Sequence, residues 1–178
     1  MESFIDLAKK RRSIRIYTEE ELSQDEVVEL MKAALLAPSS KSVRPWQFIL
    51  VDDKTLLHQL SECKPAGAQL VAGAPLAVVV VADPLLSDVW IEDTSVASTM
   101  LLLQAEDMGL GACWVQVRNR MGQDGMPAAD SIRELLALPE HYEVLSIIAV
   151  GHKALERKSV DESKLQWEKL HINRFEER

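Results

Sequence analysis

Three arginines and a serine lie within five residues near the N-terminus, in the segment Arg11-Arg12-Ser13-Ile14-Arg15. A guanidinium is always charged and presents a rigid fork of donors, which suits a phosphate dianion better than a flexible lysine does. Because the whole chain has a formal net charge of −8, this cluster indicates a local anion site and not a generally basic surface. The alternative is a solvated basic helix end, since cations stabilise helix C-termini in any case. The cluster alone leaves both interpretations open.

The other reactive residues do not form a recognised catalytic set. Gly109-Leu110-Gly111 follows a predicted helix and precedes a predicted strand, the reverse of the dinucleotide-binding fingerprint. The four histidines have no metal-ligand spacing, so no metal site is predicted. Cys63 and Cys113 lie far apart without a CxxC pair, which predicts neither a disulfide nor a zinc site and favours a reducing cytosol. If the protein is an enzyme, a bound cofactor is therefore expected to carry the chemistry.

Composition predicts one globular domain covering residues 1–178. Hydrophobic residues make up 47% and charged residues 27% of the chain, the profile of an ordinary soluble protein with a full core. The negative net charge argues against nucleic acid or an anionic membrane as a bulk partner. The N-terminus has no signal-peptide pattern, and the longest apolar stretch is short and interrupted by Pro75. A cytoplasmic location is expected.

The elements that must position the arginine cluster follow from apolar spacing. Ser3 is a candidate cap for a first helix, and Ser23 with Glu26 predicts a capping box for a second helix that ends near Ala37, before Pro38. The Val-rich segment 76–82 lacks polar alternation, which is typical of a strand covered on both faces. Further helices are predicted at about 54–63, 90–108 and 130–136, and further strands at 46–51, 111–117 and 144–150.

Some details of this plan are specific enough to test. The helix from Trp90 is apolar on nearly every side as far as Leu103, which predicts a central buried helix. Gly151 is expected to end the last strand. Residues 118–129 contain two glycines and Pro127 and are predicted to form a mobile loop or lid. The charged tail at about 158–178 has sparse apolar anchors, so it is expected to pack on another subunit, with a surface helix as the alternative.

The order of these features resembles the FMN-dependent nitroreductase family. The resemblance covers nearly the whole chain, and its strength lies in the ordered set of motifs more than in any one of them. The family implies an α+β fold, an α-β-α sandwich with a mainly antiparallel central sheet, in an intertwined homodimer. The motifs are Arg11–Arg15, Ala37-Pro38-Ser39-Ser40, Arg44-Pro45-Trp46-Gln47-Phe48-Ile49, Gly109-Leu110-Gly111-Ala112-Cys113-Trp114, and Val150-Gly151-His152-Lys153 with Arg157-Lys158.

The same resemblance implies an FMN site built by both subunits. Arg11, Ser13 and either Arg157 or Lys158 would lie near the phosphate, with Arg12 beside them. Arg15 would face the pyrimidine edge of the ring. Backbone groups of Cys113, Trp114 and Val115 would lie along the isoalloxazine. Four residues would reach the flavin from the other subunit: Pro38, Ser39, Ser40 and Ser42.

The implied activity is ping-pong hydride transfer from NADH or NADPH, through flavin N5, to a nitroaromatic, quinone or similar acceptor. Such chemistry needs no acid–base pair on the protein, in agreement with the absence of one in the sequence. Two alternatives remain at this point. The chain could be a flavin-binding module without turnover, or the same fold could perform a different flavin reaction.

Overall fold

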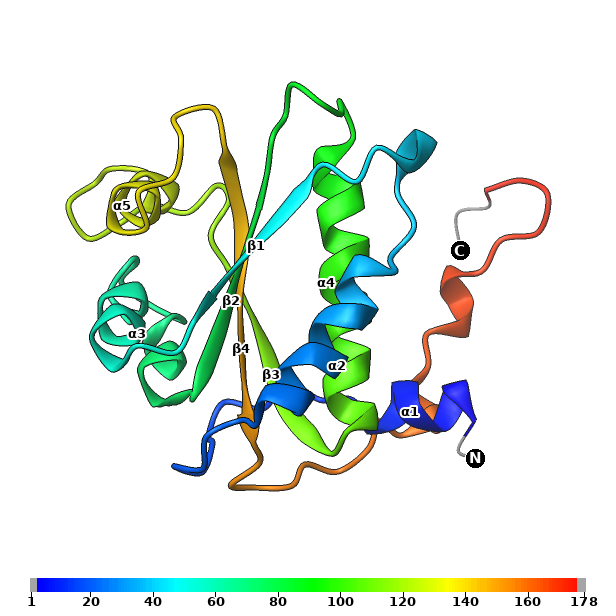
Figure 1. The fold of residues 1–178 in the computed structure, drawn as a ribbon. Coiled ribbons are helices and arrows are strands. Elements are labelled where there is room, and N and C mark those ends of the chain that lie inside the picture. Colours follow the sequence, from blue (N-terminus) through cyan, green and yellow to red (C-terminus); the bar gives the residue numbers. More distant parts are fainter. Residues whose placement is uncertain (1–2, 176–178) are drawn as a thin grey trace.

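The computed structural model describes residues 3–175 of the 178-residue chain. Its centre is an antiparallel sheet with the strand order β1-β2-β4-β3. The strands are β1 (Trp46–Val51), β2 (Leu76–Ala82), β3 (Leu110–Gln116) and β4 (Glu143–His152). Helices α3 and α5 cover one face of this sheet, and α2 and α4 cover the other (Figure 1). The predicted α+β sandwich is confirmed.

The helices lie close to the ranges that apolar spacing predicts. Their bounds are α1 (Phe4–Lys10), α2 (Gln24–Leu35), α3 (Lys54–Ser61), α4 (Trp90–Asp107) and α5 (Ala128–Leu135). Short 3-10 turns are η1 (Ser40–Ser42), η2 (Gln69–Gly73), η3 (Glu162–Lys164) and η4 (Trp167–Lys169).

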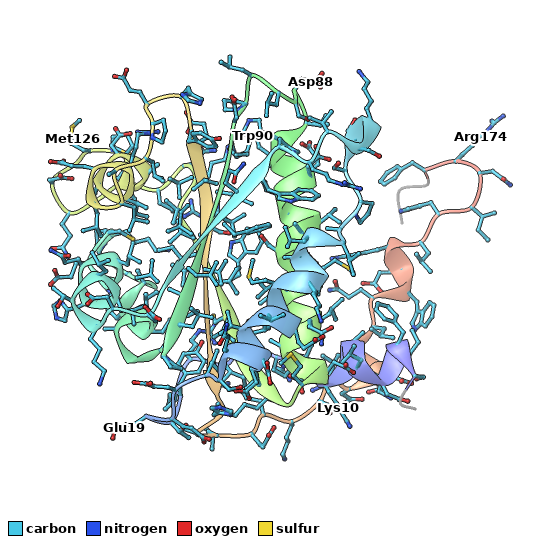
Figure 2. The ribbon with its side chains drawn as sticks, in the orientation of Figure 1. Lys10, Glu19, Asp88, Trp90, Met126 and Arg174 are labelled. Carbon is cyan, nitrogen blue, oxygen red and sulfur yellow. The ribbon has the colours of Figure 1, made fainter. Side chains whose placement is uncertain are left out.

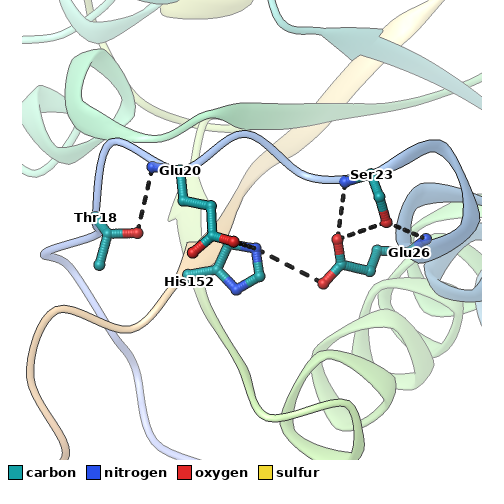
Figure 3. Close-up of polar contacts among 5 residues, drawn as sticks. All are labelled: Thr18, Glu20, Ser23, Glu26 and His152. Atoms are coloured by element: carbon teal, nitrogen blue, oxygen red, sulfur yellow. Dashed lines mark hydrogen bonds and ion pairs between the residues drawn. The ribbon is translucent and has the colours of Figure 1, made fainter.

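Local capping fixes the start of α2. The Ser23 hydroxyl accepts from the Glu26 backbone N–H, and the Ser23 backbone N–H donates to the Glu26 carboxylate at 2.8 Å (Figure 3). These reciprocal bonds satisfy two backbone donors that a bare helix end would leave unpaired. The predicted capping box is confirmed, and the whole of β2 is buried as its composition predicts.

Helix α4 is less buried in one chain than its composition suggests. A stripe at helical spacing packs on the sheet, including Trp90, Ala97, Leu101 and Ala105, whereas Val96 on the opposite side is 40% exposed. The expectation of burial on nearly every side is therefore wrong for the single chain. Apolar spacing indicates that a helix face is shielded from water, but it does not show whether the same chain or another one covers that face.

Gly151 does not end the last strand, as the sequence had suggested. β4 continues to His152, and Gly151 is paired with Gly111 of β3. A Cβ at Gly151 would lie 2.5 Å from Pro75 Cδ, so the glycine allows a close approach of the segment before β2. Its role in the strand is steric.

The C-terminal tail leaves the domain along α1 and then runs away from the sheet (Figure 1). The Val160 N–H donates to the Lys9 carbonyl at 2.9 Å, and beyond it the described tail contains only the two short turns η3 and η4. The alternative of a surface helix is thus wrong for residues 158–175, and residues 176–178 of the predicted arm lie outside the described range. Among the residues described, none of the helices has the length and apolarity needed to cross a membrane.

Candidate functional site

The arginine segment lies along the free edge of β3, the last strand of the sheet. Ser13 forms a parallel bridge with Ala112, and the Ile14 N–H donates to the Ala112 carbonyl at 3.0 Å. Ile14 is buried directly over Gly111, where a Cβ would lie 2.6 Å from Ile14 Cγ2. The absence of a side chain at Gly111 is therefore what allows this segment to dock.

Tyr17 anchors the other end of the segment. Its buried hydroxyl lies 2.7 Å from the Ile14 carbonyl and 3.1 Å from the Ala149 carbonyl of β4. Burial raises the pKa of Tyr17, so the hydroxyl remains protonated and able to donate. The next residue, Thr18, donates its N–H to the His152 carbonyl at 3.0 Å. Backbone and side-chain bonds together hold the arginine segment against the sheet.

The environment of Cys113 shows which side chains meet at the middle of β3. Burial raises the pKa of its thiol, whereas Arg15, the Ser13 hydroxyl, Arg11 and Lys64 act in the opposite direction. The pKa of this thiol is therefore sensitive to Arg11, Ser13 and Arg15, which the family resemblance assigns to the same site. The bridge between Ser13 and Ala112 lies next to Cys113 in β3.

The guanidiniums of this cluster have no carboxylate partner in the described part of the chain. In residues 3–175, no carboxylate forms an ion pair with Arg11, Arg12 or Arg15. Arg12 instead donates from Nη1 to the backbone carbonyl of Lys158. The cluster thus keeps its positive charge in a chain of net charge −8, as an anion site requires.

Lys64 is a site residue that sequence reasoning missed. It is 7% exposed, and its Nζ donates to the Gln116 carbonyl at the end of β3 at 2.7 Å. Burial lowers the pKa of Lys64, and the positive charge of Arg120 acts in the same direction. In the sequence this lysine follows a helix end and precedes Pro65, where a solvated side chain is the ordinary expectation. No local pattern could have identified it.

The loop predicted to reach the flavin from a partner lies at the N-terminal end of α4. The Ser40 N–H donates to Asp93 Oδ1 at 2.7 Å, and the buried Asp93 also accepts from Ser87. Ser39 Oγ accepts from the Arg44 N–H at 2.9 Å. Ser42 has a positive φ of 56° and, like Pro38, is exposed. The loop is held in a defined conformation at some distance from the arginine segment (Figure 1).

The length of α4 gives the scale of that separation. Lys153, which is bridged to Tyr17, donates from Nζ to Glu106 at 2.8 Å near the C-terminal end of α4. Asp93 and Glu106 are 13 residues apart in one helix, or about 20 Å along its axis. One chain therefore does not bring Ser39 and Ser40 to Arg11 and Ser13. Their assignment to the partner's site stays a prediction.

The remaining predicted residues fall into two groups. Arg157 and Lys158 are exposed at the start of the tail, and Lys158 is tied to the cluster through Arg12. Trp114 packs toward α2 and α4, with its indole N–H donating to Gln116 Oε1 at 2.9 Å. Cys113 and Val115 point to the opposite face of the strand. Within residues 3–175, no group of histidine, cysteine and acidic residues is arranged to hold a metal ion.

These features define an α+β protein with a cluster of arginines, unpaired with any described carboxylate, on the open edge of an antiparallel sheet. The sequence pattern of the Nitroreductase family matches residues 8–64 and 58–152. The chain belongs to the nitroreductase family.

Individual relatives agree with this assignment. An FMN-dependent nitroreductase from Clostridium difficile R20291 superposes with a TM-score of 0.94 at 47% identity, covering 97% of this chain and 100% of that one. A relative from Archaeoglobus fulgidus, provisionally named as an NADH dehydrogenase/NAD(P)H nitroreductase, is 38% identical over 88% of this chain and 89% of its own. An FMN reductase (NADPH) from Bacillus subtilis strain 168 is 29% identical over 86% of this chain and 67% of its own.

Proposed function

We propose that this protein is an FMN-dependent oxidoreductase that takes hydride from NADH or NADPH and passes it to a nitroaromatic, quinone or similar acceptor. One observation carries the proposal: the arginine segment is bridged to β3 through Ser13, Lys64 donates to Gln116 at the end of the same strand, and no described carboxylate pairs with Arg11, Arg15 or Lys64. The similarity to an FMN-dependent nitroreductase and to an FMN reductase supports the choice of cofactor and reaction.

The donor set suits the two anionic ends of FMN. Arg11 and Ser13, with Arg157 or Lys158, would bind the phosphate through charge-assisted hydrogen bonds. Arg15 and Lys64 would lie at the pyrimidine end of the ring, where a fixed cation stabilises negative charge near the C2 carbonyl. When bound, FMN supplies the hydride-accepting atom N5. The chain's own contribution is to bind and orient the ring and to fix positive charge beside it.

A homodimer completes the proposal. The Pro38–Ser42 loop of one subunit would close the flavin site of the other, since within one chain the loop and the arginine segment lie at opposite ends of α4. Large apolar side chains support this arrangement: Leu36 after α2 is 77% exposed, and Trp167 in the tail is 67% exposed. Exposed apolar surface of this kind is typical of an interface. We further propose that the dimer works in the cytoplasm.

The proposal is tested by titrating the apoprotein with FMN and adding NADH or NADPH without oxygen. The wild-type protein should bind FMN, and the visible absorbance of the bound flavin should be lost at a catalytically useful rate when NADH or NADPH is added. A protein that binds no FMN would refute the proposal, and one that binds FMN without being reduced would be a non-catalytic flavin-binding module.

Arg11→Ala tests the assigned phosphate contact. We expect FMN affinity to fall by about 10- to 100-fold, the scale of a lost hydrogen bond to a charged group. Lys54→Ala is the matched control, because Lys54 is an exposed cation at the start of α3. Equal FMN affinity in Arg11→Ala and wild type would remove Arg11 from the phosphate site.

A further inference from the structure

A cavity opens where the chain leaves β3. It has a volume of about 590 Å³ and lies between the N-terminal end of α4 and the segment that leads to α5. Trp90, labelled in Figure 2, forms part of its wall. Three arginines also line it: Arg118, Arg120 and Arg133. None of them belongs to the arginine cluster at the N-terminus.

The three arginines differ in whether the protein already satisfies their charge. Arg133 pairs with Asp130 at 2.5 Å and lies 3.9 Å from Glu143. Arg118 instead lies over the Trp90 ring, with its guanidinium carbon 5.9 Å from the ring centroid. In residues 3–175, neither Arg118 nor Arg120 forms an ion pair with a carboxylate. Two cations therefore remain available to a ligand in this cavity.

Hydrogen bonds fix the backbone of these two arginines in a turn. The Arg120 N–H donates to the Val117 carbonyl at 2.9 Å, and the Ala128 N–H donates to the Arg120 carbonyl at 2.9 Å. Gln116 Nε2 donates to the Arg118 carbonyl, also at 2.9 Å. The predicted lid thus begins as a bonded turn. A ligand would meet guanidiniums whose backbone is already ordered, which lowers the entropic cost of binding.

Hydrogen bonds through Gln116 connect the wall of this cavity with the end of the candidate flavin site. Gln116, which bonds the Arg118 carbonyl, also accepts from Lys64 through its own backbone carbonyl. The positive charge of Arg120 also acts, after burial, to lower the pKa of Lys64. A reactant that extends from the flavin past Lys64 would meet the arginines of this turn.

We propose that Arg118 and Arg120 form an anion subsite that binds a carboxylate or phosphate group on a reactant of the flavin. This inference rests on the proposed function and deepens it, because it makes charge on the reactant a determinant of specificity. The anion could be the acidic group of an acceptor or a phosphate of the nicotinamide donor. Both present the planar or tetrahedral oxyanion that arginine forks bind.

The test compares Arg118→Gln and Arg120→Gln holoenzymes with wild type, using pairs of reactants that differ in charge. The acceptors are 4-nitrobenzoate and neutral 4-nitrobenzyl alcohol, and the donors are NADPH and NADH. We expect KM for an anionic reactant to rise about tenfold or more, the scale of one lost charge-assisted bond. KM for the neutral alcohol should stay within twofold. Lys54→Gln, which removes one exposed cation elsewhere, should leave every KM unchanged.

The pattern of loss identifies the source of the anion. A rise confined to 4-nitrobenzoate assigns the subsite to the acceptor, a rise confined to NADPH assigns it to the extra phosphate, and equal rises for both nicotinamides assign it to their shared pyrophosphate. No rise, or an equal rise for the neutral alcohol, overturns the inference. Arg118→Lys keeps the positive charge but changes the packing on Trp90. This variant should retain part of the preference for the anionic reactant over the neutral one. If it loses as much of that preference as Arg118→Gln does, the loss comes from altered packing and not from charge.

Calorimetric binding of benzoate and NADP+ to the same variants separates this inference from the proposed function. If wild type turns over no acceptor but binds either ligand at least tenfold more tightly than both glutamine variants, the anion subsite stands and the oxidoreductase proposal fails. If wild type turns over the neutral alcohol but the variants match it in both binding and KM, the oxidoreductase proposal stands and the anion subsite fails. If turnover and selective binding are both absent, both proposals fail.

Discussion

Gly111→Ala tests whether docking of the arginine segment on β3 creates the cofactor site. The added Cβ would lie 2.6 Å from Ile14 Cγ2 and 2.8 Å from Ile14 Cβ. Ile14 cannot swing away easily, because it is 3% exposed and its N–H is bonded to the Ala112 carbonyl. Overpacking of this kind costs about 1–3 kcal/mol. The strain falls on the contact that positions Arg11, Ser13 and Arg15.

The protein can respond to this steric strain in two ways, and different measurements distinguish them. If the segment lifts from β3, only part of the population binds FMN, and a cost of about 2 kcal/mol weakens the apparent affinity about 30-fold. If the segment stays docked, the strain lowers stability instead, by about 2–4 °C in Tm per kcal/mol for a chain of this size. We expect the first outcome to dominate, since the segment lies on an open edge.

The assay is FMN titration by fluorescence quenching, together with thermal unfolding of the apoprotein. Gly73→Ala is the matched control: no heavy atom lies within 4 Å of the added Cβ, so both quantities should stay near wild type. A Gly111→Ala protein with unchanged Tm and FMN affinity would refute the steric argument. One with a lowered Tm but FMN affinity within twofold of wild type would refute the link between docking and the cofactor site.

Two further changes test the supports around the segment. Tyr17→Phe removes the buried hydroxyl shared by the Ile14 and Ala149 carbonyls, and should lower the free energy of unfolding by about 1–2 kcal/mol in urea denaturation; a stability equal to wild type would show that the hydroxyl is not an anchor. Ser23→Ala should cost about 1 kcal/mol at neutral pH. The Ser23 hydroxyl donates to the Glu26 carboxylate at 2.7 Å and lowers the pKa of Glu26, so this difference should shrink as the pH falls through that lowered pKa and the carboxyl protonates; a pH-independent difference would exclude the hydrogen bond between the Ser23 hydroxyl and the Glu26 carboxylate.

Most of the fold could be predicted because its elements follow from local physics. The reciprocal bonds of Ser23 and Glu26 start α2, and the valines of β2 occupy a strand buried on both faces. The error at Gly151 has a clear cause. A glycine that ends a strand and a glycine that lets Pro75 approach look the same in one sequence. Only the tertiary neighbour distinguishes them.

The residues of the candidate site show the same distinction between features encoded locally and features that depend on tertiary neighbours. Arg11 and Ser13 could be identified because several donors lie within five residues, so their proximity is encoded locally. Lys64 reaches Gln116 from 52 positions away in the chain, and nothing in its own segment indicates burial. Arg118 and Arg120 were assigned to a loop, and their unpaired charges become visible only when Arg133 is seen to take both nearby carboxylates.

Helix α4 places the two parts of the predicted site at opposite ends of one chain. Asp93 near its N-terminal end holds the loop through Ser40, whereas Glu106 near its other end holds Lys153 beside the arginine segment. A rigid helix keeps these two anchors about 20 Å apart, so no adjustment of loops within one subunit can join them. The outward side of the same helix, at Val96, is partly exposed and apolar. A second copy packed there would cover that surface and, if its loop met the first copy's arginine segment, would complete both flavin sites through the same contact.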